Sequence, residues 1–111
     1  MSRKEKILAM LADDPGDTFL RYSLAMELRS EGDHEESLGK LGELMTDAPP
    51  YVPAFFMAAQ QLVDLGRIDE ARSRLREGID QARDQGDAHA AAEMSELLAT
   101  LGALGEEDDP L

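Results

Sequence analysis

The 111-residue chain carries 24 acidic and 11 basic residues, a formal net charge of −13, and no cysteine. The lack of cysteine excludes a disulfide framework and a thiolate metal site. The negative charge makes nucleic acid and anionic membranes poor partners, because both are polyanions. No apolar run approaches the roughly 20 residues that a bilayer requires, and the N-terminal stretch does not read as a signal peptide, so a cytoplasmic location is expected.

The excess of acidic residues has three interpretations that the sequence leaves open. It can keep the protein soluble, it can match a high-salt cytoplasm, or it can attract a basic partner. Only Lys4, Lys6 and Lys40 are lysines, and a surface poor in lysine fits the second interpretation. All three concern solubility and encounter rather than fold.

The first predicted helix covers about residues 2–12. Ser2 and Glu5 form a capping box, which satisfies backbone N–H groups at a helix start. The sequence Asp14-Pro15-Gly16 is expected to end this helix, since proline and glycine both interrupt helical backbone.

The second and third predicted helices meet at Gly32. Asp17 or Thr18 can cap the second helix, and Gly32 ends it because glycine tolerates a left-handed backbone. Asp33 to Glu36 is read as a second capping box. Apolar residues at helical spacing predict the buried sides: Leu20, Leu24, Ala25 and Leu28 in the second helix, and Leu38, Leu41, Leu44 and Met45 in the third.

The fourth and fifth predicted helices repeat this arrangement around Gly66. Pro49-Pro50 breaks the third helix, and Pro53 suits the first turn of the fourth, where its missing N–H costs nothing. The fifth helix is expected to run to about Asp84. The predicted buried residues are Phe55, Ala58, Ala59 and Leu62 in the fourth helix, and Ile68, Ala71, Leu75, Ile79 and Ala82 in the fifth.

A sixth helix is predicted from about Ala88 to Leu101, after a stop and cap at Gly86-Asp87. The acidic residues 103–111 are expected to form a flexible tail. No segment alternates apolar and polar residues over the length of a strand, so the chain is predicted to be all-α.

Gly32 and Gly66 lie 34 residues apart, and the residues around them correspond. A small residue follows each glycine by five positions, which indicates that two helices cross closely there. The aligned pairs are Ala25 and Ala59, Leu28 and Leu62, Ser37 and Ala71, and Leu41 and Leu75.

This period and these helix–turn–helix units resemble the tetratricopeptide repeat family. The resemblance implies a right-handed stack of antiparallel helix pairs, with repeats at about residues 18–51 and 52–85. Since such units cannot bury their apolar faces alone, helices 2–12 and 87–101 are interpreted as terminal caps. Residues 1–102 are then expected to form a single domain.

The resemblance has two departures. The family's aromatic residue near the start of each repeat is met by Phe55, but Arg21 takes that place in the first repeat. Its closing proline is met by Pro49, but the second repeat has Arg83 there, which is why its second helix is expected to run long.

In this family the first helix of each pair lines a concave groove, which implies a protein-interaction module or scaffold. The mostly apolar side chains here favour a peptide or helical segment of an unidentified partner protein, with Arg29 and Gln60 orienting it. The alternative is a weak homodimer through the same surface. The expected groove residues are Phe19, Tyr22, Met26 and Arg29, then Pro53, Phe56, Gln60 and Val63, and from the capping helix Ala90 and Met94.

The sequence offers no catalytic, cofactor-binding or metal-binding constellation. His34 stands among acidic residues, but neighbouring helical positions point in different directions and make a poor ligand set. His89 has no obvious catalytic partner. We therefore expect neither an enzyme nor a bound cofactor.

Overall fold

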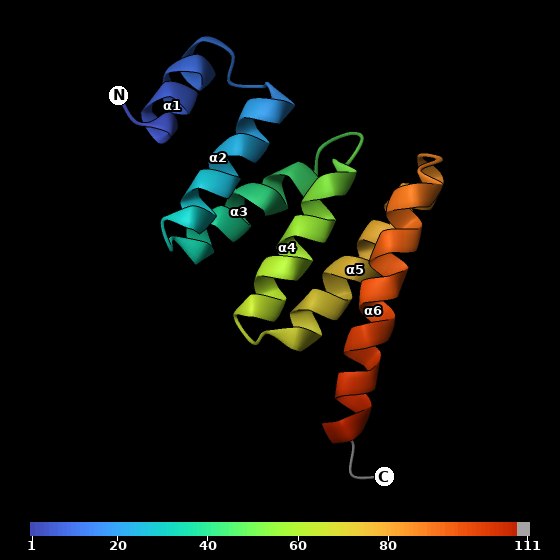
Figure 1. The fold of residues 1–111 in the computed structure, drawn as a ribbon. Coiled ribbons are helices and arrows are strands. Elements are labelled where there is room, and N and C mark those ends of the chain that lie inside the picture. Colours follow the sequence, from blue (N-terminus) through green and yellow to red (C-terminus); the bar gives the residue numbers. More distant parts are fainter. Residues whose placement is uncertain (109–111) are drawn as a thin grey trace. The chain divides into compact units, whose positions relative to one another are not determined.

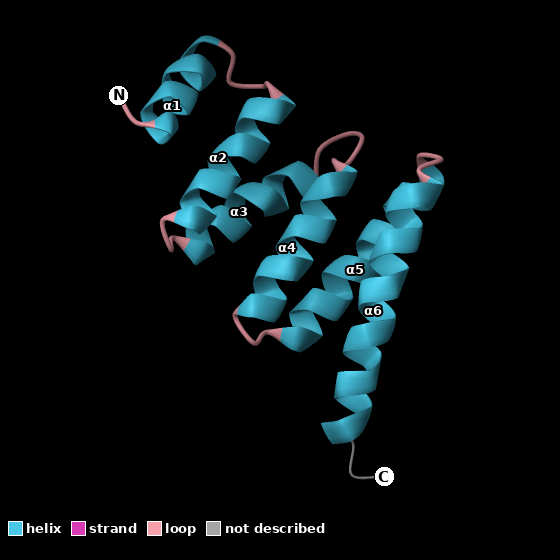
Figure 2. Ribbon diagram, in the orientation of Figure 1, coloured by secondary structure: helices cyan, strands magenta, loops and turns pink. Residues whose placement is uncertain are grey.

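A computed structural model describes the backbone of residues 1–108 and the side chains of residues 1–102. All regular secondary structure in this part of the chain is helical (Figure 2), which confirms the predicted all-α fold. The helices are shown in chain order in Figure 1: α1 (Arg3–Asp13), α2 (Thr18–Ser30), α3 (His34–Met45), α4 (Val52–Asp64), α5 (Ile68–Asp84) and α6 (Ala88–Asp108).

The chain divides into two compact units, Met1–Ala54 and Phe55–Leu111. The first holds α1 to α3 and the start of α4, and the second holds the rest of α4 with α5 and α6. The single domain over residues 1–102 that the sequence suggests stays a prediction.

Two of the three predicted side-chain caps at the starts of α1, α2 and α3 are present. The amide of Glu5 donates to Ser2 Oγ at 3.1 Å, and the amide of Leu20 donates to Asp17 Oδ1 at 2.9 Å. The side chain of Asp33 makes no capping hydrogen bond, so that predicted box is wrong. The backbone at Asp33 has ψ of 65°, whereas Ser2 and Asp17 are extended, as a cap requires.

Three helices end in the same way, at a glycine with left-handed backbone. Gly32, Gly66 and Gly86 have φ values of 84°, 76° and 77°. The amide after each glycine donates to a carbonyl five residues earlier, which satisfies a group that a helix end leaves open. These bonds join Asp33 to Leu28 at 2.9 Å, Arg67 to Leu62 at 2.8 Å and Asp87 to Ala82 at 2.8 Å.

In the first unit, α1 packs on α2 and α2 packs on α3. Ile7, Leu24 and Leu28 form a buried cluster that joins α1 to α2, with the half-buried Leu11 beside it. The predicted close crossing of α2 and α3 occurs at the completely buried Ala25 and Ser37. Burial of this apolar surface holds the three helices together.

Arg21, the departure from the family pattern, has a structural role in the first unit. Its guanidinium donates to both carboxylate oxygens of Asp47, at 2.6 and 3.2 Å. The hydrogen bond to Asp47 is the main cause that raises the pKa of Arg21. The pair ties the first turn of α2 to the segment after α3, and a bidentate pair of this kind also fixes orientation.

In the second unit, α5 packs on α6, and α4 approaches both helices at Gly78. A Cβ atom added at Gly78 would lie 2.5 Å from Phe55 Cβ and 2.6 Å from Met94 Sδ. Gly78 therefore lets the helices come closer than any other residue would allow. Arg72 adds a polar link, donating to the carbonyl oxygen of Leu101 at 2.7 Å.

The C-terminal helix is longer than the sequence suggested. The predicted end at Leu101 is wrong, because α6 continues to Asp108. Leu101 itself is buried and anchors this helix in the second unit. Residues 109–111, the end of the expected acidic tail, lie outside the described residues.

Candidate functional site

The predicted groove residues of α2 lie beside the buried side of the helix and are less buried than it. Phe19, Tyr22, Met26 and Arg29 follow one another at intervals of three or four residues, which places them on one helical face. Phe19 is 71% exposed, and the other three are half-buried. The buried residues of α2 are Leu24, Ala25 and Leu28.

Tyr22 is held by a second aromatic ring, which the sequence analysis did not assign to the site. The ring of Tyr51 meets it edge-on, with centroids 5.5 Å apart and planes at 73°. The amide of Tyr51 donates to Leu44 at 2.9 Å, which fixes the segment between α3 and α4. Edge-to-face pairs of this kind are favourable, so Tyr22 and Tyr51 form a defined aromatic surface.

The electrostatics at Tyr22 are consistent with this half-buried position. Burial is the largest cause that raises the pKa of the Tyr22 hydroxyl, and Tyr51 adds to it. Arg29 acts in the opposite direction and lowers it. The phenol is therefore neutral near pH 7 and available as a hydrogen-bond donor and acceptor.

The predicted groove residues of α4 repeat the spacing of those in α2, 34 positions further on. Pro53 and Gln60 are exposed, and Phe56 and Val63 are half-buried. The other side of α4 is buried through Phe55, Ala58, Ala59 and Leu62. Each of the two helices thus has one buried face and one face whose apolar side chains stay accessible to solvent.

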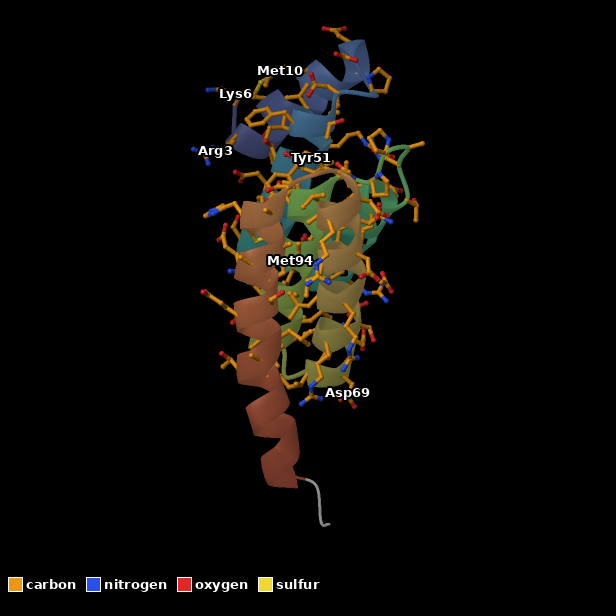
Figure 3. The ribbon with its side chains drawn as sticks, turned by 90° about the vertical axis from the view of Figure 1, so that its right-hand side faces the viewer. Arg3, Lys6, Met10, Tyr51, Asp69 and Met94 are labelled. Atoms are coloured by element: carbon orange, nitrogen blue, oxygen red, sulfur yellow. The ribbon has the colours of Figure 1, made fainter. Side chains whose placement is uncertain are left out.

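Met94 does not belong to this surface, and its assignment to a groove is wrong. The side chain is completely buried, and its sulfur lies close to Gly78 in α5. Figure 3 shows Met94 on the side of α6 that faces α5. The missing side chain at Gly78 creates the space that Met94 fills, and this relationship could not be read from α6 alone. Ala90 is half-buried.

Two residues with clear roles escaped the sequence analysis. Tyr51 could have been found, since an aromatic residue directly before a predicted helix is a candidate for contact with the preceding helix pair. Gly78 carried a signal as well, because glycine in the middle of a helix is unfavourable unless close packing requires it. Neither signal identifies the role of its residue until the side chain that packs against it is known.

The two histidines were the only candidate metal ligands that the sequence singled out. Over residues 1–102, no group of three or more His, Asp or Glu side chains is arranged to hold a metal ion. His89 instead contacts Glu93, with 2.7 Å between its Nε2 and a carboxylate oxygen. Within the described part of the chain, no helix is long and apolar enough to cross a membrane.

These helix pairs define an α-helical repeat protein. The first helix of each repeat has one buried and one accessible face. The family profile of the tetratricopeptide repeat matches residues 28–104. The chain therefore belongs to the tetratricopeptide repeat family, as the spacing of Gly32 and Gly66 indicated. Membership of this family makes protein–protein interaction the class of function.

Two solved structures are similar to this chain. A tetratricopeptide repeat domain protein from Salinibacter ruber, solved by NMR, has a TM-score of 0.74 and 28% identity, covering 81% of this chain and 91% of that one. A protein from Bordetella parapertussis has a TM-score of 0.77 and 23% identity, covering 93% and 90%. The second likeness shows the fold alone. A search of curated proteins found no match.

Proposed function

We propose that this protein binds a peptide or helical segment of a partner protein through the outward side chains of α2 and α4. Non-covalent capture by exposed apolar anchors is the mechanism. Phe19, Tyr22, Met26, Phe56 and Val63 supply the contact energy, and Arg29 and Gln60 orient the ligand.

The observation that carries this proposal is the exposure of Phe19. Its side chain is 71% accessible on a chain with a net charge of −13. Burying an aromatic side chain away from water is favourable, and most of the Phe19 side chain stays in contact with water in the free protein. It lies one helical turn from Tyr22, so the exposed ring and the Tyr22–Tyr51 pair lie on one side of the first unit.

The half-buried residues support the same conclusion. Rings and methionines that are held in place but still accessible lose little conformational freedom when a ligand arrives. Methionine adapts to ligands of different shape. The neutral hydroxyl of Tyr22 can give or receive one hydrogen bond at the edge of the apolar surface.

The test uses a peptide array of amphipathic segments followed by calorimetry on the segments captured. We expect affinities around micromolar or weaker, as small interfaces give. Truncating one anchor, as in Phe19→Ala, is expected to cost about 2 kcal/mol of binding free energy. The double variant Tyr22→Ala/Phe56→Ala is expected to abolish capture.

The matched control is Leu65→Ala. Leu65 is a large apolar residue that is also exposed, but it lies at the turn after α4 rather than on the proposed surface. It is expected to bind like the wild type. Capture that the double variant leaves unchanged would refute the assignment of the site.

A further inference from the structure

We propose a second interaction surface: the outward face of α1 pairs, antiparallel, with α1 of a second copy of the chain. The proposed interface is formed by Arg3, Lys6, Met10 and Asp13. It shares no residue with the peptide-binding surface of α2 and α4, so the two proposals stand or fall separately.

The N-terminal segment exposes large apolar side chains. Five large apolar side chains are exposed among those described, and three of them, Met1, Leu8 and Met10, belong to the N-terminal segment. Leu8 is 45% and Met10 48% accessible. Only Met10 belongs to the proposed interface, because Leu8, two positions away, lies on the other side of α1. Ala9, which borders the interface beside Asp13, is exposed and small, so another helix can approach the backbone closely. A terminal helix of a repeat protein ordinarily has a polar outer face, and on α1 the exposed Met10 interrupts that face.

The charges on the outward face of α1 are arranged so that they complement the same face of a second copy. Arg3, Lys6, Met10 and Asp13 recur at intervals of three or four and share one helical face. Figure 3 shows the first three following one another along one side of α1. The stripe begins with two cations and ends with an anion. Two such stripes placed antiparallel bring the cations of each copy opposite the anion of the other, and the two-fold axis makes every contact twice.

Two of these charged residues make no ion pair within the first unit. Arg3 and Lys4 pair with Glu27 and Glu31 near the end of α2, at 3.3 and 3.1 Å. Lys6 makes no ion pair with any of the described residues, and neither does Asp13, the last residue of α1.

The order of these charges is also unfavourable for an isolated helix. The helix dipole favours anions near the N-terminus and cations near the C-terminus. The charges on α5 follow that rule, with Asp69 and Glu70 in its first turn and Arg83 in its last. In α1, Lys6 lies near the positive end and Asp13 at the negative end. Opposite charges from a second, antiparallel helix would compensate both.

The net charge of the chain explains why α1 is the place of contact. Two copies with a net charge of −13 repel each other over most of their surfaces. Residues 1–13, which include all of α1, carry three cations and two anions, so this segment does not share the strong negative charge of the whole chain. At physiological ionic strength, charges more than about 8 Å apart are largely screened, and the local attraction between α1 helices then outweighs distant repulsion.

The test is sedimentation equilibrium of the full chain in 0.15 M salt, from about 10 µM to 1 mM, where interfaces of this small size associate. We expect a reversible dimer. Lys6→Glu and Asp13→Lys, each placing like charges opposite one another twice, are expected to weaken it roughly threefold to tenfold. An equal mixture of the two variants is expected to regain a heterodimer, since the new carboxylate then faces the new ammonium.

Lys40→Glu is the matched control, because it makes the same change in net charge on α3 and is expected to leave association unchanged. Circular dichroism verifies that every variant keeps its helices. A wild type that stays monomeric throughout, or a mixture without heterodimer, would overturn the proposal. So would a dimer that survives Lys6→Glu and is lost in Tyr22→Ala/Phe56→Ala, or a monomer that binds an acidic peptide through α1 instead.

Discussion

The hydroxyl of Ser37 in α3 donates a hydrogen bond to the carbonyl oxygen of Ala25 in α2, at 2.7 Å, and both residues are completely buried. This contact marks the closest crossing of the first helix pair. The second repeat has Ala59 and Ala71 at the corresponding positions, both completely buried and without a hydroxyl. Small side chains are therefore common to both repeats at these positions, whereas the hydrogen bond occurs only in the first repeat.

Substitutions at Ser37 should separate size from hydrogen bonding. Ser37→Ala is expected to lower the free energy of unfolding by about 1 kcal/mol, the net value of one buried hydrogen bond. Ser37→Leu should cost about 2–3 kcal/mol, because the crossing has no room for a longer side chain. Urea unfolding measures both values. Equal losses for the two variants would show that the crossing tolerates bulk.

A second prediction concerns the glycine within α5. Replacing glycine by alanine inside a helix ordinarily stabilises it by about 1 kcal/mol. Gly78→Ala should instead destabilise by about 1–3 kcal/mol, since the added methyl would meet Phe55 and Met94. Gly39→Ala in α3 is the control: nothing lies within 4 Å of its added Cβ, and it should raise the thermal midpoint. A rise for Gly78→Ala would contradict the close packing described here.

A third prediction concerns the turn between the helices of the second repeat. Gly66 has a φ of 76°, a backbone region in which a side chain costs about 1 kcal/mol or more. Gly66→Ala should lose about that much stability in denaturant unfolding, although nothing lies near the added Cβ. Gly16→Ala, at a turn glycine without positive φ, should leave stability unchanged or slightly higher. A neutral Gly66→Ala would mean that the turn adopts another conformation.

A fourth prediction uses the raised pKa of Tyr22. In the variant Tyr51→Phe, Tyr22 is the only tyrosine left, and ultraviolet absorbance reports its ionisation. Because burial is the largest cause of the shift, Tyr22 should still titrate above the ordinary value of about 10. In denaturant it should return to that value. An ordinary pKa in the folded variant would show that Tyr22 is more open to water than described.

The same shift fixes the sign of a stability effect. The folded state keeps the Tyr22 proton at a pH where the unfolded chain has lost it. This contribution to stability is complete below about pH 10 and declines as pH rises through the folded pKa. The free energy of unfolding should therefore fall with rising pH in that window, and it should fall less steeply in Tyr22→Phe.

Features that depend on a few neighbouring residues could be predicted from the sequence. Gly32 and Gly66 end their helices because only glycine enters left-handed backbone without cost, and Ser2 and Asp17 start theirs because a short polar side chain reaches an amide three residues on. The spacing of Leu24, Leu28 and their counterparts fixed which sides are buried. These features repeat every 34 residues, which made the family recognisable.

Features that depend on the residues packed against a helix became visible only in the folded chain. Met94 shares its helical spacing with the buried Ala91 and Leu101, but the sequence of α6 does not show that its sulfur fills the space beside Gly78. Asp33 looks like a cap, but its own backbone is not extended and its side chain makes no capping hydrogen bond. The helical period says which residues share a face, but the partner opposite that face is set by chain segments far away in sequence.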